Sequence, residues 1–274
     1  YVGLNVKGLV GNPLKKAHAA LLFVCSIGHA KKTIKKFNPD IVVGFGGYPS
    51  ASAVQAAFGL KIKTMIHEQN SIIGLTNKIL IKKVDQIVCC YQKAYQEFPK
   101  EKTLLLGNPR ASVIVHEQPK DVYDEYHLDR QKKVVTIVMG SLGSQTVNQT
   151  MKECMDQFKG KDYQVVYVSG KPYYESMKDY ENENVKIIPY VDDMPSLMHA
   201  TDLIVSRAGA STLAELTALG VPAILIPSPY VAANHQEYNA RELVNNQAAD
   251  MILEKDLTGE KLISTIDAII NDES

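Results

Sequence analysis

Residues 203–239 read LIVSRAGASTLAELTALGVPAILIPSPYVAANHQEYN, and this stretch decides the fold class. An apolar run ends in small residues, a helical pattern follows, and a second apolar run ends at Pro227. This alternation is typical of a strand, a crossover helix and a parallel strand. The small residues at the start of the expected helix leave backbone N–H groups open to an anion such as a diphosphate. The stretch therefore predicts an α/β fold with a ligand site at the end of a strand.

Polar side chains in the same stretch could complete such a site. Ser211 and Thr212 add hydroxyl donors at the helix start, and Glu215, further along the helix, could accept both hydroxyls of a ribose. The next loop brings Gln236 and Asn239, which are three residues apart and so share a helix face. The alternative is an ordinary helix start, with Ser211 or Thr212 near the N-cap and Glu215 completing a capping box. The second polar pair favours a sugar-nucleotide site over that alternative.

The alternation of strands and helices continues along the whole chain. The apolar runs expected to form strands are residues 41–43, 64–67, 86–90, 103–106, 134–139, 164–169, 185–189, 203–206, 223–227 and 249–253. Residues 108–132 lack a long apolar run and are the expected linker. At 274 residues the chain exceeds the usual size of one domain. The sequence therefore predicts two Rossmann-like domains, residues 1–120 and 121–274, whose parallel sheets face one another across a cleft.

Composition narrows the class of protein. Hydrophobic content of 45% and charged content of 22% are ordinary for a globular chain, and no apolar stretch approaches the length of a membrane span. Cys25, Cys89, Cys90 and Cys154 form no C-x-x-C pair, which favours buried reduced thiols over disulfides or a metal site. The pair at 192–193, Asp-Asp, has no partner at metal-ligand spacing, so helix capping is expected there.

Charge is divided unequally along the chain. Residues 1–120 hold 17 Lys and Arg against 6 Asp and Glu, whereas residues 121–274 hold 13 against 24. A basic half could meet nucleic acid or an anionic bilayer. No aromatic platform for RNA is visible, and lysines stand beside apolar residues in stretches 13–23 and 79–83. This mixture favours contact with a membrane surface, with a solvated helix face as the alternative.

Glycine and polar clusters follow several of the expected strands. Residues 140–144, GSLGS, could form a phosphate-binding turn or only a tight turn that needs glycine. Residues 67–70, HEQN, place four polar side chains in succession after a strand, which favours a functional role. Arg110, near the expected domain junction, could reach a diphosphate or form an interdomain salt bridge.

Several motifs together resemble one family. GFGGYPS (44–50), HEQNSIIGLTNK (67–78), GNPR (107–110), GSLGS (140–144), YVDDM (190–194), RAGASTLAE (207–215) and HQEYNA (235–240) occur in the order of the bacterial MurG-type N-acetylglucosaminyltransferases. The resemblance covers nearly the whole chain and implies a two-domain GT-B glycosyltransferase with no cofactor and no metal. It implies inverting transfer of N-acetylglucosamine from UDP-N-acetylglucosamine to the 4-hydroxyl of undecaprenyl-diphosphate-linked muramyl pentapeptide, in peptidoglycan synthesis.

The family's contacts carry over by position. The resemblance implies that the donor is bound by Asn70, Arg110, Ser141, Val191, Ala210, Ser211, Thr212, Leu213, Ala214, Glu215 and Gln236, with Val191 at the uracil and Gln236 at the sugar. It assigns Tyr48, His67 and Glu68 to the acceptor or to the floor of the cleft. It also implies a peripheral protein on the cytoplasmic face of the cell membrane, in contact with anionic lipid around residues 14–23 and not with nucleic acid.

The chain departs from the family pattern in two places. Family members begin with a strand and a Gly-rich loop ending in a histidine, a leading candidate for the catalytic base, whereas this chain begins at Tyr1, downstream of that loop. Its end at Ser274 also comes early, so we expect truncation at both ends and assign no catalytic base. The usual G-G-S-Q-G turn reads MGSLG at 139–143, which keeps the serine and replaces a glycine and the glutamine.

Rival functions fit less of the sequence. A UDP-sugar epimerase or a diglyceride glucosyltransferase could share the scaffold, but HEQN and GLTNK argue against both. A non-catalytic protein that binds a UDP-sugar or the lipid acceptor is the rival from another class.

Overall fold

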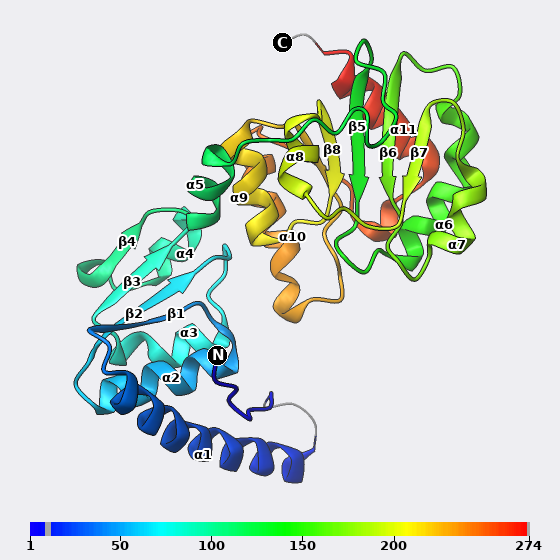
Figure 1. The fold of residues 1–274 in the computed structure, drawn as a ribbon. Coiled ribbons are helices and arrows are strands. Elements are labelled where there is room, and N and C mark those ends of the chain that lie inside the picture. The colour runs from blue at the N-terminus through cyan, green and yellow to red at the C-terminus, as the bar shows by residue number, and fades with distance from the viewer. Residues whose placement is uncertain (9–11, 273–274) are drawn as a thin grey trace. The chain divides into compact units, whose positions relative to one another are not determined.

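The computed structural model describes residues 1–8 and 12–272 and divides into two compact units, unit 1 (Tyr1–Asn108) and unit 2 (Pro109–Ser274) (Figure 1). Each unit contains one parallel sheet with helices packed around it, so the α/β fold class is confirmed. Helix α5 (Pro109–His116) lies in the stretch expected to be a linker and packs on helix α9 (Ala210–Leu219) of unit 2. The chain therefore re-enters regular structure directly after Asn108.

Unit 1 has a four-stranded sheet in the order β1-β2-β3-β4. Its strands are β1 (Ile41–Gly44), β2 (Lys63–Glu68), β3 (Gln86–Cys89) and β4 (Thr103–Leu105). Its helices are α1 (Pro13–Phe37), α2 (Gly47–Gly59), α3 (Leu75–Leu80) and α4 (Gln92–Glu97). All strand pairs are parallel, so the loops after β1, β2 and β3 leave the sheet at the same edge.

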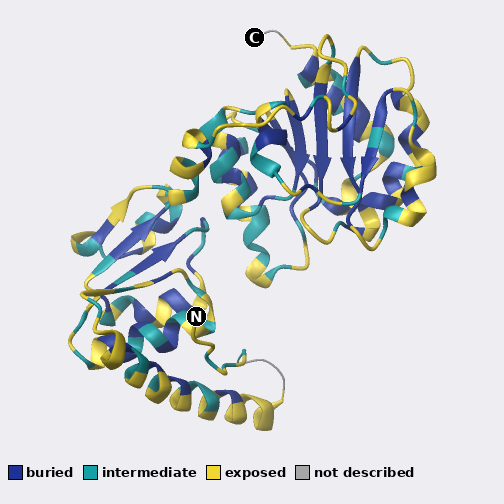
Figure 2. Ribbon diagram, in the orientation of Figure 1, coloured by how far each residue is buried: buried dark blue, intermediate teal, exposed yellow. Residues whose placement is uncertain are grey.

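Helix α1 is capped at both ends. The Asn12 side chain accepts a hydrogen bond from the Lys15 N–H, Pro13 occupies the first turn, and Asn38 ends the helix in the left-handed region with φ of 52°. A narrow stripe, which includes Ala30 and Ile34, is buried, and α1 packs on α2. Most of the remaining helix surface is exposed (Figure 2). Among the described residues, no helix combines the length and apolar character needed to cross a membrane.

Unit 2 has a six-stranded sheet in the order β10-β9-β8-β5-β6-β7. Its strands are β5 (Lys133–Val138), β6 (Tyr163–Val168), β7 (Val185–Ile188), β8 (Leu203–Ser206), β9 (Ala223–Leu225) and β10 (Asp250–Met251). Besides α5 and α9, its helices are α6 (Gln145–Cys154), α7 (Tyr174–Met177), α8 (Met194–His199), α10 (His235–Asn245) and α11 (Gly259–Ile270). Every pair in this sheet is parallel.

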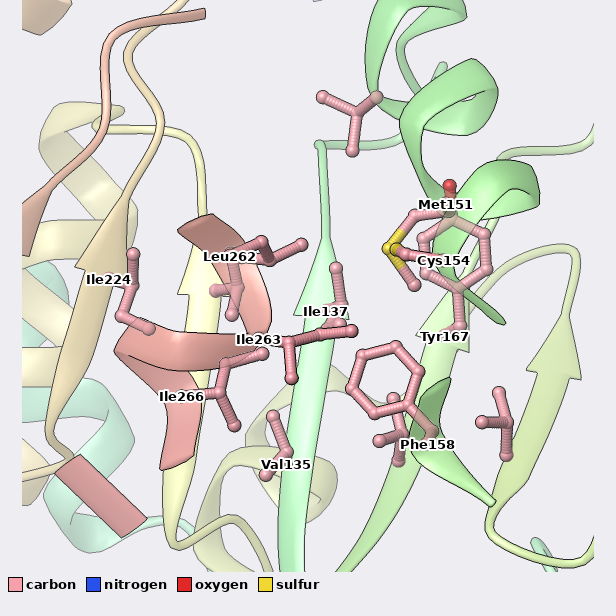
Figure 3. Packing of buried hydrophobic residues seen from close by; sticks show 14 of the residues in the cluster. Val135, Ile137, Met151, Cys154, Phe158, Tyr167, Ile224, Leu262, Ile263 and Ile266 are labelled. Carbon is pink, nitrogen blue, oxygen red and sulfur yellow. The ribbon is translucent and has the colours of Figure 1, made fainter. Parts of the chain in front are cut away.

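The core of unit 2 explains why its central strands are apolar throughout. Strands β6 and β8 are buried at every position, because helices cover both faces of a parallel sheet (Figure 2). On one face, side chains from β5 such as Ile137 pack against Phe158 and against Leu262 and Ile266 of α11 (Figure 3). This cluster packs α11 against the central strands. It therefore stabilises the sheet from whose edges the loops emerge.

The order of strands in unit 2 creates a crevice. From β5 the chain adds β6 and β7 on one side, and then β8, β9 and β10 on the other. Strands β5 and β8 are neighbours in the sheet, and their last residues, Val138 and Ser206, are paired. The connections that follow these two strands therefore lead away from one another. A ligand in an open α/β sheet binds at such a switch point, outside the carboxyl ends of the strands.

The cysteines only partly follow the expectation. Cys89 and Cys154 are buried and Cys90 is half-buried, and burial raises the pKa of the Cys89 thiol to about 11 and that of Cys90 to about 12. Cys25 is exposed, so the prediction of a buried thiol is wrong there. The buried stripe of α1 passes through its neighbour, Ser26, and this turns Cys25 toward solvent.

Candidate nucleotide-sugar site

A cavity of about 740 Å³ lies at the switch point of unit 2. Its wall includes the turn after β5, the loop and first turns of α9 after β8, and the segment between β9 and α10. Five of the residues expected to bind a donor line it, namely Ser141, Val191, Thr212, Glu215 and Gln236. The expected residues thus converge from elements that are far apart in sequence.

The start of α9 has no side-chain cap. Gly209 occupies the N-cap, so no side chain makes a capping hydrogen bond to the first N–H groups of the helix. The Leu213 N–H bonds to the Gly209 carbonyl at 2.9 Å, so the N–H groups before it have no intrahelical acceptor. The capping box considered for Glu215 is therefore wrong, because no hydroxyl-bearing residue stands at the N-cap. The N-terminal end of α9 faces the cavity through Gly209 and Thr212.

Other expected residues of α9 have different surroundings. Leu213 is buried in the core, so only its backbone could meet a ligand. Ala210, Ser211 and Ala214 are not fully buried, and they neighbour the lining residues without being part of the wall.

The turn after β5 needs glycine, as the interpretation of a tight turn predicted. Gly140 and Gly143 have φ of 78° and 71°, and a Cβ on Gly143 would lie 2.3 Å from the Ser169 carbonyl oxygen. Glycine is therefore required by the backbone, while the turn also lines the cavity. Leu142, which replaces the family's glutamine, is 74% exposed.

A buried polar network holds this turn in place. Asn148 on α6 donates from Nδ2 to the Ser144 carbonyl at 2.8 Å and to the Ser169 carbonyl at 3.1 Å. The hydroxyl of Tyr167, which is itself buried, donates to Asn148 Oδ1 at 2.8 Å. The network fixes the amide of Asn148 and thereby the path of the glycine turn.

Gln236 and Asn239 do not act as a pair. Gln236 Oε1 accepts from the Ser228 N–H at 2.8 Å and lines the cavity. Asn239 is fully buried and donates from Nδ2 to the Ala208 carbonyl at 3.3 Å. The expectation that both side chains reach a ligand is therefore wrong for Asn239. That residue ties α10 to the loop before α9.

The opposite end of the cavity is mainly apolar. Val191, Met194 and Met198 line it together with Tyr190, whose ring lies 4.7 Å from Lys171 Nζ. Asp193 caps α8 by accepting from the Ser196 N–H at 3.2 Å, which confirms helix capping at this pair. The Lys120 ammonium and this N–H bond lower the pKa of Asp193.

Arg110 and Glu215 are in direct contact, 105 positions apart in sequence. Arg110 Nε donates to Glu215 Oε1, and Arg110 Nη1 lies 4.0 Å from Glu117 Oε1. The hydrogen bond to Glu215 raises the pKa of the Arg110 guanidinium. Arg110 therefore forms a salt bridge, but the expectation of an interdomain one is wrong, because Arg110, Glu117 and Glu215 all belong to unit 2.

A second ion pair below α9 was not anticipated from the sequence. Arg207 Nη2 lies 2.5 Å from Glu254 Oε2, with both side chains nearly buried, and Arg207 Nη1 donates to the Ile226 carbonyl at 3.0 Å. The pair joins the end of β8 to the segment after β10. Arg207 belongs to the RAGAST motif. Its partner Glu254 lies 47 positions later, and nothing in the sequence around Glu254 indicates the pair.

In unit 1 the HEQN segment organises its own loop. Glu68, nearly fully buried, accepts from the Asn70 N–H at 3.1 Å, from Asn70 Nδ2 at 3.3 Å, from the Gly74 N–H at 2.9 Å and from Asn77 Nδ2 at 2.8 Å. A carboxylate with several N–H donors fixes the loop that follows β2. The carboxylate of Glu68 is thus turned into the loop, where it acts as a structural acceptor.

His67 and Tyr48 lie near the same edge of the unit 1 sheet. His67 is buried, with Nε2 at 3.1 Å from the Gly107 carbonyl and its ring 5.2 Å from that of Phe45, while Nδ1 has no hydrogen-bond partner within the described residues. Tyr48 is half-buried beside Gly8, where an added Cβ would lie 3.2 Å from the tyrosine ring.

Comparison with known proteins gives a consistent result. Residues 134–274 match the model of the glycosyltransferase family 28 C-terminal domain, and residues 1–89 match that of its N-terminal domain. A UDP-N-acetylglucosamine–N-acetylmuramyl-(pentapeptide) pyrophosphoryl-undecaprenol N-acetylglucosamine transferase of Bacillus cytotoxicus is 45% identical over 253 residues, which cover 90% of this chain and 70% of that protein. The enzyme of the same name from Listeria monocytogenes serotype 4a is 43% identical over 266 residues, covering 95% and 73%.

Solved structures agree with the sequence matches. The crystal structure of Acinetobacter baumannii MurG superposes with a TM-score of 0.77 at 27% identity, covering 98% of this chain and 76% of that one. A putative UDP-N-acetylglucosamine 2-epimerase from Listeria monocytogenes has a TM-score of 0.70 at 13% identity, covering 93% and 72%. The epimerase likeness shows a shared fold and nothing more.

Proposed function

Because the chain belongs to glycosyltransferase family 28, we propose that it transfers N-acetylglucosamine from UDP-N-acetylglucosamine to an undecaprenyl-diphosphate-linked muramyl pentapeptide, a step of peptidoglycan synthesis. Its two parallel-sheet units have the GT-B fold. The observation that carries the proposal is the cavity at the switch point of unit 2, where a helix N-terminus, a glycine turn and Glu215 meet.

We propose one orientation for the donor in this cavity. We assign the diphosphate to the N-terminal end of α9 and to Ser141 in the glycine turn, since N–H and hydroxyl donors there face the cavity. Glu215 accepts from the ribose hydroxyls. The uracil belongs at the apolar end, against the backbone of Val191, and the sugar belongs toward Gln236. The volume of about 740 Å³ is in the range of small-molecule pockets.

The reaction needs charge stabilisation on the leaving group. The 4-hydroxyl oxygen of the acceptor attacks C1 of N-acetylglucosamine, the bond from C1 to the β-phosphate oxygen breaks, and UDP leaves with the electron pair while a base takes the hydroxyl proton. Negative charge then grows on the diphosphate. The dipole of α9, its first N–H groups and the Ser141 hydroxyl are directed at that charge.

Unit 1 is assigned to the acceptor. Tyr48 and His67 lie at the carboxyl edge of its sheet, where the loops after β1 and β2 emerge, and Glu68 holds the second of these loops through Asn70 and Asn77. We assign Asn70 to the donor side of the reaction on the strength of its motif alone. Glu68 acts by positioning this loop.

We also propose that α1 meets an anionic membrane surface. Leu14 and Leu21, which are 81% and 62% exposed, share a helix side with Lys32, since one residue advances the helix by about 100°. Two exposed leucines therefore stand in the first half of this side, and an exposed lysine stands in the second. Such a helix can lie in a lipid headgroup layer and bring the protein to a lipid-linked acceptor.

Transfer of label tests the function directly. The chain is incubated with UDP-N-acetylglucosamine labelled in the sugar and with the lipid-linked muramyl pentapeptide in detergent, and label in the lipid fraction is counted. We expect incorporation from this donor and at least about tenfold less from UDP-glucose, which lacks the acetamido group. Equal incorporation from both donors would contradict the proposed donor. Binding of the donor without any transfer would favour a non-catalytic sugar-nucleotide-binding protein.

A further inference from the structure

A second cavity, of about 630 Å³, adjoins the proposed donor cavity in unit 2. The segment between β9 and α10 forms a wall that both cavities share. Ser228 and Gln236 on this segment line the donor cavity. Pro229 and Glu237 line the second cavity, and Tyr230 lines both. The second cavity therefore lies next to the end of the donor cavity to which the sugar is assigned.

Polar contacts hold this wall in a sparsely populated backbone conformation. Ala233 and Asn234 both have φ of 53°, in the left-handed region. Asn234 Nδ2 donates to Glu237 Oε2 at 2.6 Å. Arg241 donates to Glu237 Oε1 from Nε at 3.0 Å and from Nη2 at 2.6 Å. Glu237 therefore fixes both the wall and the guanidinium of Arg241, so the second cavity has a defined shape before a ligand binds.

The second cavity carries one positive charge in excess, because each of the two carboxylates that line it is paired with an arginine. Glu254 pairs with Arg207. Glu237 pairs with Arg241. Lys255 also lines the cavity and is exposed, and among the described residues no carboxylate oxygen lies within 4.0 Å of its ammonium. Residues 121–274 hold 13 Lys and Arg against 24 Asp and Glu, so a local positive charge on this acidic part of the chain favours an anionic group of a ligand.

We propose that the second cavity binds the peptide of the acceptor and that Lys255 meets the C-terminal carboxylate of this peptide. The inference rests on the proposed function for the identity of the acceptor. In a muramyl peptide, the lactyl group that carries the peptide is on C3, beside the 4-hydroxyl that attacks the sugar. When this hydroxyl reaches C1 of N-acetylglucosamine in the donor cavity, the start of the peptide must lie beside that cavity as well.

The chemistry and the length of the peptide suit the second cavity. A peptide joined to the lactyl group through its N-terminus ends in a free carboxylate, the group that an ammonium attracts. Five extended residues span at most about 18 Å, so they can cross a wall that is one segment thick. Pro229 and Tyr230 are exposed and offer rigid apolar surface to the part of the peptide between its two ends.

NMR titration of the intact, isotope-labelled chain in excess UDP tests this assignment. The probes are N-acetylmuramyl pentapeptide with a free C-terminus, the same molecule with an amidated C-terminus, and N-acetylmuramic acid methylamide, which has no peptide. Each probe is titrated into wild type, Lys255→Gln and Lys261→Gln. Lys261 is the matched control, because it is also an exposed lysine of unit 2 but does not line the cavity. Each preference is a ratio of two dissociation constants measured on one protein, so a partly unfolded sample does not change it.

Wild type should bind the free pentapeptide about twofold to fivefold more tightly than the amidated one, the value of an exposed ion pair. This preference should vanish in Lys255→Gln, persist in Lys261→Gln and shrink at high salt. Both pentapeptides should bind at least about tenfold more tightly than the methylamide, because only they bury apolar surface in the second cavity. The resonances that shift with the peptide should include those of Tyr230 and Leu253, which line this cavity.

Three results would overturn the inference. Wild type could bind the free and the amidated pentapeptide equally, Lys255→Gln could keep the preference, or the peptide could add nothing to the affinity of the methylamide. Any of these in a chain that binds UDP would refute the peptide site and leave the donor assignment intact. Failure of the wild-type chain to bind UDP is a different result, since it would remove the proposed function together with this inference.

Discussion

Gly143 shows how closely one residue can determine the shape of the site. It has φ of 71°, and a Cβ there would lie 2.3 Å from the Ser169 carbonyl oxygen, a backbone atom that cannot rotate away. Gly160 has the same φ of 71°, but an added Cβ would meet no atom within 4 Å. The two glycines thus share a backbone conformation and differ in the space beside them.

This difference gives a matched pair of substitutions. Gly160→Ala should lower the free energy of unfolding of unit 2 by about 1 to 2 kcal/mol, the cost of the left-handed conformation for alanine. Gly143→Ala should cost about 1 to 3 kcal/mol more, because the turn must move to relieve the contact. Urea unfolding of both variants measures this. Gly143→Ala should also weaken UDP binding, whereas equal stability of the two variants would contradict the close approach.

Asp85 gives unit 1 a pH-dependent contribution to stability. Its Oδ2 accepts from the Thr64 N–H at 2.8 Å and from Thr64 Oγ1 at 3.0 Å, and the backbone bond from Thr64 is the main reason that its pKa is lowered. A lowered pKa in the folded state stabilises the fold above the unfolded value of about 3.9. That contribution is lost as the pH falls through the folded pKa.

The substitution Asp85→Asn removes the charge and keeps the shape. It should lower the free energy of unfolding by about 1 kcal/mol at pH 7, since hydrogen bonds to a charged acceptor are stronger than those to a neutral one. The difference from wild type should shrink as the pH is lowered below about 4. Urea unfolding at pH 7 and pH 3 checks this, with exposed Asp40→Asn as the control for loss of one negative charge. A difference independent of pH would refute the role given to the carboxylate.

Long-range pairs limit what could be predicted at the residue scale. The sequence indicated that Arg110, Glu215 and Gln236 belong to a functional region, because each stands in a polar cluster after an apolar run. It did not indicate that Arg110 contacts Glu215, or that Asn239 is buried against the Ala208 carbonyl. Such partners depend on packing between elements that have no local signal in the chain.

At the scale of elements, the strands were the most predictable feature. All ten expected runs coincide with or overlap β1–β10, because short apolar runs separated by longer helical patterns are easy to distinguish along the chain. The start of α9 was less predictable. Ser211 and Thr212 are good N-cap residues, but the helix begins earlier, at Gly209, and so leaves its N–H groups to the cavity. The glycine turn was left open between two roles; the need of its backbone for glycine is confirmed, and phosphate binding stays a prediction.

The buried pair of Arg207 and Glu254 connects two elements below the site. Breaking a buried ion pair typically costs about 3 to 5 kcal/mol, since one charge is left without a partner. The pair joins Arg207, which follows β8, to the segment after β10. Arg207 Nη1 also donates to the carbonyl of Ile226, the residue that follows β9. These contacts make the loop that precedes α9 rigid before a ligand binds.

At the scale of the whole molecule, much of the excess positive charge of residues 1–120 lies on α1. The helix presents exposed lysines and exposed apolar side chains together, which is the mixture that the sequence associated with a membrane surface. Of the two stretches considered, 13–23 is largely exposed, whereas in 79–83 Leu80 is buried and Ile79 is exposed. Helix packing decided that difference, and charge counts could not show it.

Binding to vesicles tests the role of α1. Wild-type chain should sediment with vesicles that contain phosphatidylglycerol, and Leu21→Glu should weaken this binding by about tenfold, since one leucine contributes about 1.5 to 3 kcal/mol when fully buried. Lys32→Glu should weaken it at low salt and matter less at high salt. Tyr180→Glu, on an exposed aromatic residue of unit 2, is the control. Equal binding of Leu21→Glu and wild type would exclude α1 as the contact.

The central claim is that unit 2 holds a UDP-sugar at its switch point, and calorimetric titration of the intact chain with UDP-N-acetylglucosamine tests it most directly. We predict one site per chain, with weaker binding of both UDP-glucose and deoxythymidine diphosphate. The first control lacks the acetamido group, and the second lacks the transferred sugar as well as the 2′-hydroxyl that Glu215 would bind. Absence of binding, or equal affinity for all three nucleotides, would contradict the assignment of this cavity to the donor.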